Sequence, residues 1–187
     1  MAALGLALAL AWSASPALAQ KNLSETTVRK LMSYAWDLVP QKFTTPRGRV
    51  ILTDKNDTKA GMVPMQVSRQ IIGVARLSAY AQICGLFGLQ TDNYNTMMRI
   101  ELAKKKWSEQ QMLFINQMHL FVVQWLTGNV RVNIDKDGKR TVQPLRGKGS
   151  KKAQTCSKSQ RAKVRAAIEA YLDANPPPKR KAANKVK

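Results

Sequence analysis

The chain has 187 residues, a formal net charge of +20, two cysteines and one histidine. This length is sufficient for one domain with a hydrophobic core, and a single histidine excludes a metal site built from several histidines. The positive charge bears on partners and solubility rather than on the fold, and it favours polyanionic partners.

The first 19 residues indicate a removable export signal. Leu4 to Trp12 form an apolar stretch that is too short to span a bilayer, and Ala17-Leu18-Ala19 provides a small-x-small cleavage pattern. The segment lacks the basic residues with which signal peptides usually begin, so an uncleaved N-terminal anchor is the alternative. We expect cleavage near Ala19 and a periplasmic or secreted mature chain without a transmembrane helix.

An amphipathic helix is expected next, opened by Ser24 and ended by Pro40. Residues 41–63 then lose the helical period and are punctuated by proline and glycine. A short strand at 50–52 and a polar turn at 54–57 are expected there. The acidic residues of that turn lack the closing glutamate of an EF-hand, so we interpret them as turn formers rather than calcium ligands.

Two long apolar-periodic segments within residues 65–127 are the expected centre of the fold. The first predicts a helix from about Gln66 to Leu86, ended by the backbone freedom of Gly85 and Gly88. We expect a hinge to follow this helix, at residues 88–93.

The second central segment exceeds the usual length of a globular helix. Thr91 or Asp92 can cap its first free N–H groups. Residues 108–111, Ser-Glu-Gln-Gln, match a capping box, which predicts a break. We therefore expect helices near 93–106 and 108–127.

A β-hairpin is expected near residues 129–143. Apolar and polar residues alternate in its first half, 135–138 supply a strong turn signal, and 139–143 can return as the partner strand. The stretches that begin at Arg49 and Arg131 are alike, either by chance or because their strands lie side by side in one sheet.

A last helix is expected at about 159–175, after a loop of glycine, serine and lysine at 146–155. Cys156 immediately precedes this helix, and Cys84 lies near the end of the first central helix. In an oxidising compartment two cysteines usually pair, and the long loop that this pair would close implies about 4 kcal/mol of stabilisation in the entropic model. Two buried free thiols are the alternative if the chain is not exported.

Positive charge is concentrated in residues 136–187, which hold 16 Lys and Arg against three acidic residues. Residues 176–187 begin with three prolines and continue into a basic run, so we expect this tail to be disordered. The region supplies the candidate anion-binding residues, which are Lys148, Lys151, Lys152, Lys158, Arg161, Lys163, Arg165, Lys179, Arg180 and Lys181.

His119 lies beside an apolar helical stripe, and a partly buried core histidine is the simpler interpretation. The alternative is a ligand shared with a methionine to copper or to a b-type haem. Methionines on helices more often fill the core. Those available are Met97, Met98, Met112 and Met118.

Glu101 and Glu109 are the carboxylates of the second central segment. A glycosidase needs one glutamate of raised pKa and a second carboxylate, yet no lytic-enzyme motif surrounds Glu101. We expect Glu101 to form a helix-surface ion pair with Lys104 or Lys105. The basic run that ends at Trp107 is interpreted as a solvated face with a tucked tryptophan, with a membrane or nucleic-acid contact as the alternative.

The sequence thus predicts a mainly α protein, a compact bundle of about four to five helices with a small β-hairpin, one disulfide and a disordered basic C-terminus. A single helical domain is expected over residues 20–175. The favoured function is a non-enzymatic, envelope-associated binding or accessory protein that contacts an anionic surface (phospholipid or lipopolysaccharide) or an acidic protein. A nucleic-acid-binding protein and a Met/His metal or haem carrier are the alternatives, and no catalytic residue or cofactor is assigned.

Overall fold

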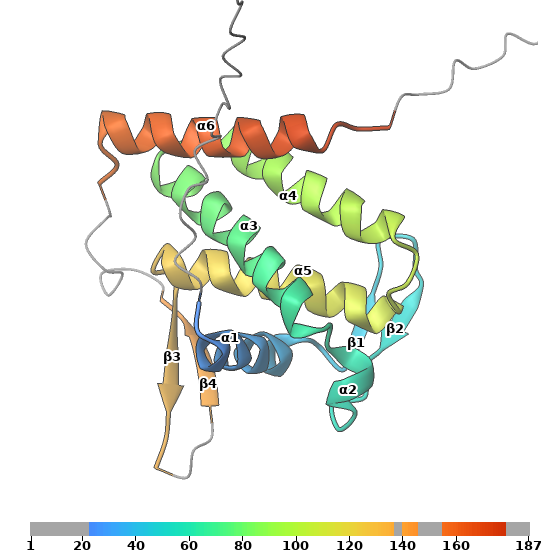
Figure 1. The fold of residues 1–187 in the computed structure, drawn as a ribbon. Coiled ribbons are helices and arrows are strands. Elements are labelled where there is room, and N and C mark those ends of the chain that lie inside the picture. Colours follow the sequence, from blue (N-terminus) through green and yellow to red (C-terminus); the bar gives the residue numbers. More distant parts are fainter. Residues whose placement is uncertain (1–22, 137–139, 146–154, 179–187) are drawn as a thin grey trace, which may run out of the picture.

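The computed structural model describes residues 23–136, 140–145 and 155–178. This part of the chain is mainly helical, as predicted, and it also contains two β-hairpins (Figure 1). In chain order its elements are α1 (Glu25–Leu38), β1 (Lys42–Thr44), β2 (Val50–Leu52), α2 (Thr58–Gly61), α3 (Met65–Ile83), α4 (Phe87–Ala103), α5 (Glu109–Leu126), β3 (Val130–Ile134), β4 (Arg140–Pro144) and α6 (Lys158–Ala174).

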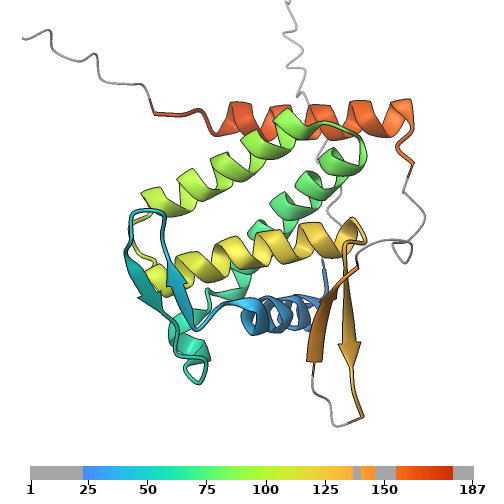
Figure 2. The same ribbon diagram turned by 180° about the vertical axis from the view of Figure 1, so that it is seen from behind.

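Helix α5 is the centre of the main core, because α1 and α3 both pack on it. Phe114 and Met118 of α5 are fully buried, and the Phe114 ring meets Trp36 of α1 in an edge-to-face arrangement. Burying a side chain of this size contributes about 1.5–3 kcal/mol each. Figure 2 shows α1 below α5 and α3 behind it, and these two helices cover different sides of α5, which explains why α5 is apolar on several sides.

The turn between α3 and α4 differs from the expected hinge at 88–93. Gly85 adopts a φ of 65°, which ends α3, and α4 begins at Phe87. Gly88 lies inside the first turn of α4, where it faces open space. The predicted helix start at residue 93 is therefore wrong, because glycine is tolerated at the exposed start of a helix and does not by itself mark a break.

Neither Thr91 nor Asp92 caps a helix, contrary to the prediction, because both lie within α4. The side chain of Thr91 instead donates back to the carbonyl of Phe87, one turn earlier. The predicted break after α4 is confirmed. Lys105 has a φ of 51°, and the Ser108 hydroxyl accepts from the backbone N–H of Gln111 in a capping box.

The two hairpins form separate sheets, so the possibility that their strands share one sheet is excluded. β2 pairs with β1, and β3 pairs with β4. The strand at 50–52 was predicted but its partner was not, since β1 has only three residues and no apolar alternation. The acidic residues of the next turn cap backbone groups, as expected: the carboxylates of Asp54 and Asp57 accept from Asn56 and Ala60.

Helix α6 lies across the ends of α3 and α4 that meet at their shared turn (Figure 1). Its stripe of Val164, Ile168 and Leu172 packs on a second, smaller apolar cluster around Ala81 and Leu86. Apart from the half-buried Ala167 and Tyr171, the rest of α6 is exposed, so this helix presents a broad face to the solvent. The predicted signal segment, the loop at 146–154 and the tail from 179 onward lie outside the described residues.

Candidate functional site: the start of helix α6

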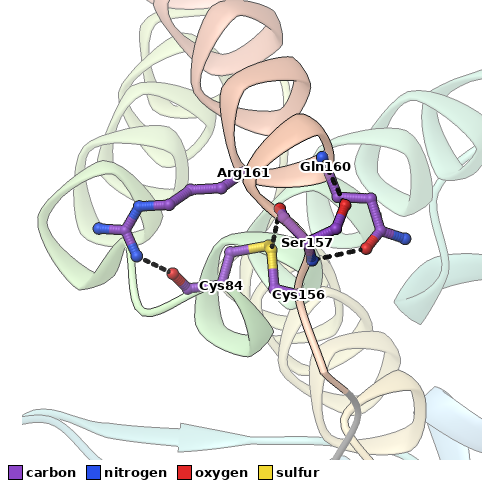
Figure 3. The surroundings of a disulfide bond; sticks show 5 residues. All are labelled: Cys84, Cys156, Ser157, Gln160 and Arg161. Atoms are coloured by element: carbon purple, nitrogen blue, oxygen red, sulfur yellow. Dashed lines mark hydrogen bonds between the residues drawn. A yellow bond between two sulfur atoms is a disulfide. The ribbon is translucent and has the colours of Figure 1, made fainter.

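The disulfide between Cys84 and Cys156 joins the end of α3 to the residue before the N-cap of α6, as predicted, with the two Cα atoms 5.0 Å apart. Ser157 caps α6, and its hydroxyl accepts from the backbone N–H of Gln160. The Gln160 side chain in return accepts from the backbone N–H of Ser157, which completes a capping box (Figure 3). The first turn of α6 is therefore held in place by covalent and hydrogen bonds.

Arginines fasten α6 at both ends. Arg161, in the first turn of α6, donates to the carbonyl oxygen of Cys84 at 2.5 Å (Figure 3). At the other end, Arg99 of α4 donates to the carbonyl oxygens of Asn175 and Pro176 at 2.5 and 3.2 Å. In both cases a guanidinium donates to carbonyl oxygens at a helix end, which have no intrahelical partners.

Four of the ten predicted anion-binding residues are described, and all four lie on the exposed part of the first two turns of α6. Arg161 is engaged with Cys84, and Arg165 forms an exposed ion pair with Glu169 at 3.3 Å. The side chains of Lys158 and Lys163 form no hydrogen bond or ion pair within the described residues. The other candidates lie outside the described residues: Lys148, Lys151, Lys152, Lys179, Arg180 and Lys181.

The charges along α6 run against its own dipole. Lys158 and Arg161 stand at its N-terminal end, and its acidic residues, Glu169 and Asp173, lie in the second half. A helix N-terminus favours anions by about 0.3–1 kcal/mol each and disfavours cations by a similar amount. The stability of α6 by itself therefore does not explain why Lys158 stands in its first turn.

Lys163 also lines a cleft beside the disulfide, with a volume of about 260 Å³. Cys84, Cys156 and Val164 contribute to its lining, together with Tyr80 of α3. Tyr80 is 42% exposed. The cleft therefore combines apolar groups with a half-exposed tyrosine and an unpaired lysine.

His119 is a buried core residue, consistent with the simpler of its two interpretations. Its Nε2 lies 3.1 Å from the hydroxyl of Ser78, which also accepts from the amide of Asn93. Burial lowers the pKa of His119 to about 4. No group of three metal-ligating His, Cys, Asp or Glu side chains occurs in the described part, and the nearby Met118 is fully buried in the core.

The predicted ion pair between Glu101 and Lys104 is confirmed, but its predicted surface position is wrong, because Glu101 is only 4% exposed. It accepts from Lys104 at 2.6 Å and from the indole N–H of Trp107 at 2.8 Å. Trp107 packs against the core, as expected, and Lys106 lies over its ring at 4.5 Å. Glu101 thus fastens the turn between α4 and α5, a role that helical periodicity does not reveal.

No protein-family model matches this sequence, and neither the curated proteins nor the solved structures include a significant match. Within the described ranges, no helix has the length and apolar character needed to cross a bilayer. The disulfide is compatible with an extracellular location. The chemistry of the residues alone therefore carries the functional argument.

Proposed function

We propose that this protein is exported to the cell envelope and binds an anionic phospholipid surface, without catalysis, through the start of α6. The observation that carries the proposal is the run of four cations on the exposed part of the first two turns of α6, two of which, Lys158 and Lys163, have no partner among the described residues. A disulfide supports export, because structural disulfides persist in oxidising compartments.

The sequence around α6 strengthens this proposal. Residues 146–165 hold eight Lys and Arg and no acidic residue. Lys158 and Lys163 are free of internal partners among the described residues, so their charges are available to a ligand. A basic residue near an anionic membrane contributes about 1 kcal/mol to binding.

The proposal is tested with vesicles of phosphatidylcholine that either contain or lack phosphatidylglycerol. The variant Lys158→Gln/Lys163→Gln/Arg165→Gln removes three charges, while glutamine preserves helix propensity. We expect affinity for the anionic vesicles to fall about 100-fold if each residue contributes as above. Vesicles without phosphatidylglycerol should bind neither protein.

A matched control removes three charges elsewhere, through Lys30→Gln/Lys42→Gln/Lys59→Gln. These lysines are exposed on α1, β1 and α2. If both triple variants lose affinity equally, net charge rather than the start of α6 governs binding. If duplex DNA is bound more tightly than anionic vesicles, with a steep salt dependence, nucleic acid is the partner instead.

A further inference from the structure

A second cleft, distinct from the start of α6, opens between helices α4 and α5. The two helices diverge from their connecting turn, with α3 behind them (Figure 2). The cleft has a volume of about 430 Å³, within the range of small-molecule sites. We call it the α4–α5 cleft, and its lining residues are Gln82, Phe87, Gln90, Thr91, Tyr94, Asn116, His119, Leu120, Val123 and Gln124.

The lining mixes polar and apolar groups and carries no formal charge. Four of its ten described residues are primary amides, and two are hydroxyl-bearing, yet none is Lys, Arg, Asp or Glu. His119 is neutral near pH 7, since its pKa is lowered to about 4. In a chain of net charge +20, an uncharged cleft is unsuited to the anions that the rest of the surface attracts.

The polar groups of the cleft are held by a buried network. Asn93 of α4 donates to the Ser78 hydroxyl at 2.9 Å, and Ser78 meets Nε2 of His119. Nδ1 of His119 has no hydrogen-bond partner among the described residues. Tyr94 donates to the amide oxygen of Asn116 at 2.7 Å, which links α4 to α5 across the cleft.

Apolar side chains complete the lining. Phe87 is 64% exposed at the start of α4, and Leu120 of α5 is 44% exposed. An exposed aromatic face beside amides offers two kinds of contact at once: the ring packs on apolar C–H groups, and the amides both donate and accept hydrogen bonds. A ligand that matches this set has many hydroxyls or amides, apolar C–H faces and no charge.

We infer that the α4–α5 cleft binds a neutral carbohydrate, one or two sugar residues long. Sugar hydroxyls donate and accept as amides do, and one sugar face packs on Phe87. The amides that hydrogen-bond the sugar hydroxyls are those of Gln124, Asn116 and the pair Gln82 and Gln90. The side chains of this pair are bonded to each other at 3.2 Å.

Peptide ligands fit this cleft less well. An extended peptide adds to a strand edge, whereas this cleft is lined by helices whose backbone groups are already bonded. An amphipathic helix docks in a groove of mainly apolar anchors, whereas seven of the ten residues that line this cleft have polar side chains. Charged peptide side chains would also find no counter-ion among the residues that line the cleft.

The test uses an array of neutral and acidic glycans, probed with the purified protein at high salt so that binding through α6 is suppressed. We expect retention of at least one neutral hexose or N-acetylhexosamine glycan. Titration of that glycan by calorimetry should show affinity about tenfold lower for Phe87→Ala and a similar loss for Gln124→Ala. Both positions are outside the buried core, so circular dichroism should be unchanged.

Two matched controls lie on the same helices but outside the cleft. Leu102→Ala removes an exposed apolar side chain of α4, and Gln117→Ala removes an amide of α5. Both should bind the glycan like the parent protein. The inference is overturned if no neutral glycan is retained, if only acidic glycans are retained, or if Phe87→Ala and Gln124→Ala bind as tightly as the two controls.

Discussion

Arg161 of α6 and Cys84 of α3 form a hydrogen bond that adds to the disulfide between the same two helix ends. The guanidinium donates to the Cys84 carbonyl at 2.5 Å, while the Cys84 sulfur is bonded to Cys156, five residues before Arg161. The cation also meets the negative end of the α3 dipole there. One predicted anion-binding residue is therefore a structural residue, and the variants used to test binding leave it intact.

Arg161→Gln should destabilise the protein by about 1 kcal/mol, because it removes a charged donor from a carbonyl at a helix end. Arg165→Gln on the same helix should cost less than about 0.5 kcal/mol, since its ion pair with Glu169 is half exposed on both sides. Urea denaturation of both variants measures the difference. Equal losses would show that the bond to Cys84 adds nothing to stability.

Removal of the disulfide should lower stability by about 4 kcal/mol in the entropic model, because the bond closes a loop of 72 residues. For a chain of this size that corresponds to roughly 10 °C in Tm. Scanning calorimetry of Cys84→Ser/Cys156→Ser measures the loss. Protein from the periplasm should show no free thiol when it is denatured without reductant, and two titratable thiols would contradict the pairing in the cell.

Stability should depend on pH through His119. Its pKa is lowered by burial to about 4, whereas an unfolded histidine titrates near 6.5. The unfolded state therefore binds more protons between these values, so the contribution is complete above pH 6.5 and is lost as pH falls to about 4. The shift corresponds to about 3 kcal/mol.

The comparison that isolates this effect is His119→Gln, which keeps a polar side chain but cannot titrate. Between pH 7 and pH 4 the parent should lose about 3 kcal/mol more unfolding free energy than the variant. Carboxylates titrate in both proteins and cancel in the difference. Parallel stability curves would mean that the folded histidine titrates near its ordinary pKa.

Helical periodicity predicted α1, α5 and α6 closely, because each buries apolar residues at helical spacing, α1 and α5 in the main core and α6 on the second cluster. Ser24 and Ser108 are local capping signals, and two cysteines allow only one pairing within the chain. Gly88 misled the prediction of α4, since glycine marks a break only where the backbone requires a positive φ. At Gly85 it does; at Gly88 it does not.

The candidate sites were less predictable, because they depend on contacts between distant residues. Arg99 meets the end of α6 some 76 residues later, and no local pattern signals that bond. The α4–α5 cleft likewise combines residues of three helices, so it was not predicted. Because the predicted helix began near residue 93, Asn93 stood at its start, where asparagine is common, and gave no sign of a buried polar network.

The bond between Arg99 and Pro176 shows where the basic tail can be removed without loss of this contact. Truncation after Pro178 keeps that contact and removes Lys179, Arg180, Lys181, Lys185 and Lys187. We expect unchanged circular dichroism and Tm, with weaker binding to anionic vesicles at low salt. Equal binding by both proteins would exclude the tail from the interaction, and unfolding would show that it packs on the helices.

The buried hydroxyls of α3 provide a matched pair for the network beneath the cleft. Ser68 and Ser78 are both fully buried, but the Ser68 hydroxyl has no hydrogen-bond partner among the described residues, whereas Ser78 meets Asn93 and His119. Ser78→Ala should cost about 1–3 kcal/mol, because it leaves polar groups unsatisfied. Ser68→Ala should be neutral or stabilising, because it removes an unpaired buried hydroxyl.

Chemical denaturation of the two alanine variants measures this difference, and the volume change is the same in both. The amide N–H signals of α5 around His119 should also shift in Ser78→Ala and stay in place in Ser68→Ala, since Ser78 is bonded to the ring and Ser68 is not. Equal destabilisation by the two substitutions would mean that the hydrogen bonds of Ser78 contribute no more than its packing.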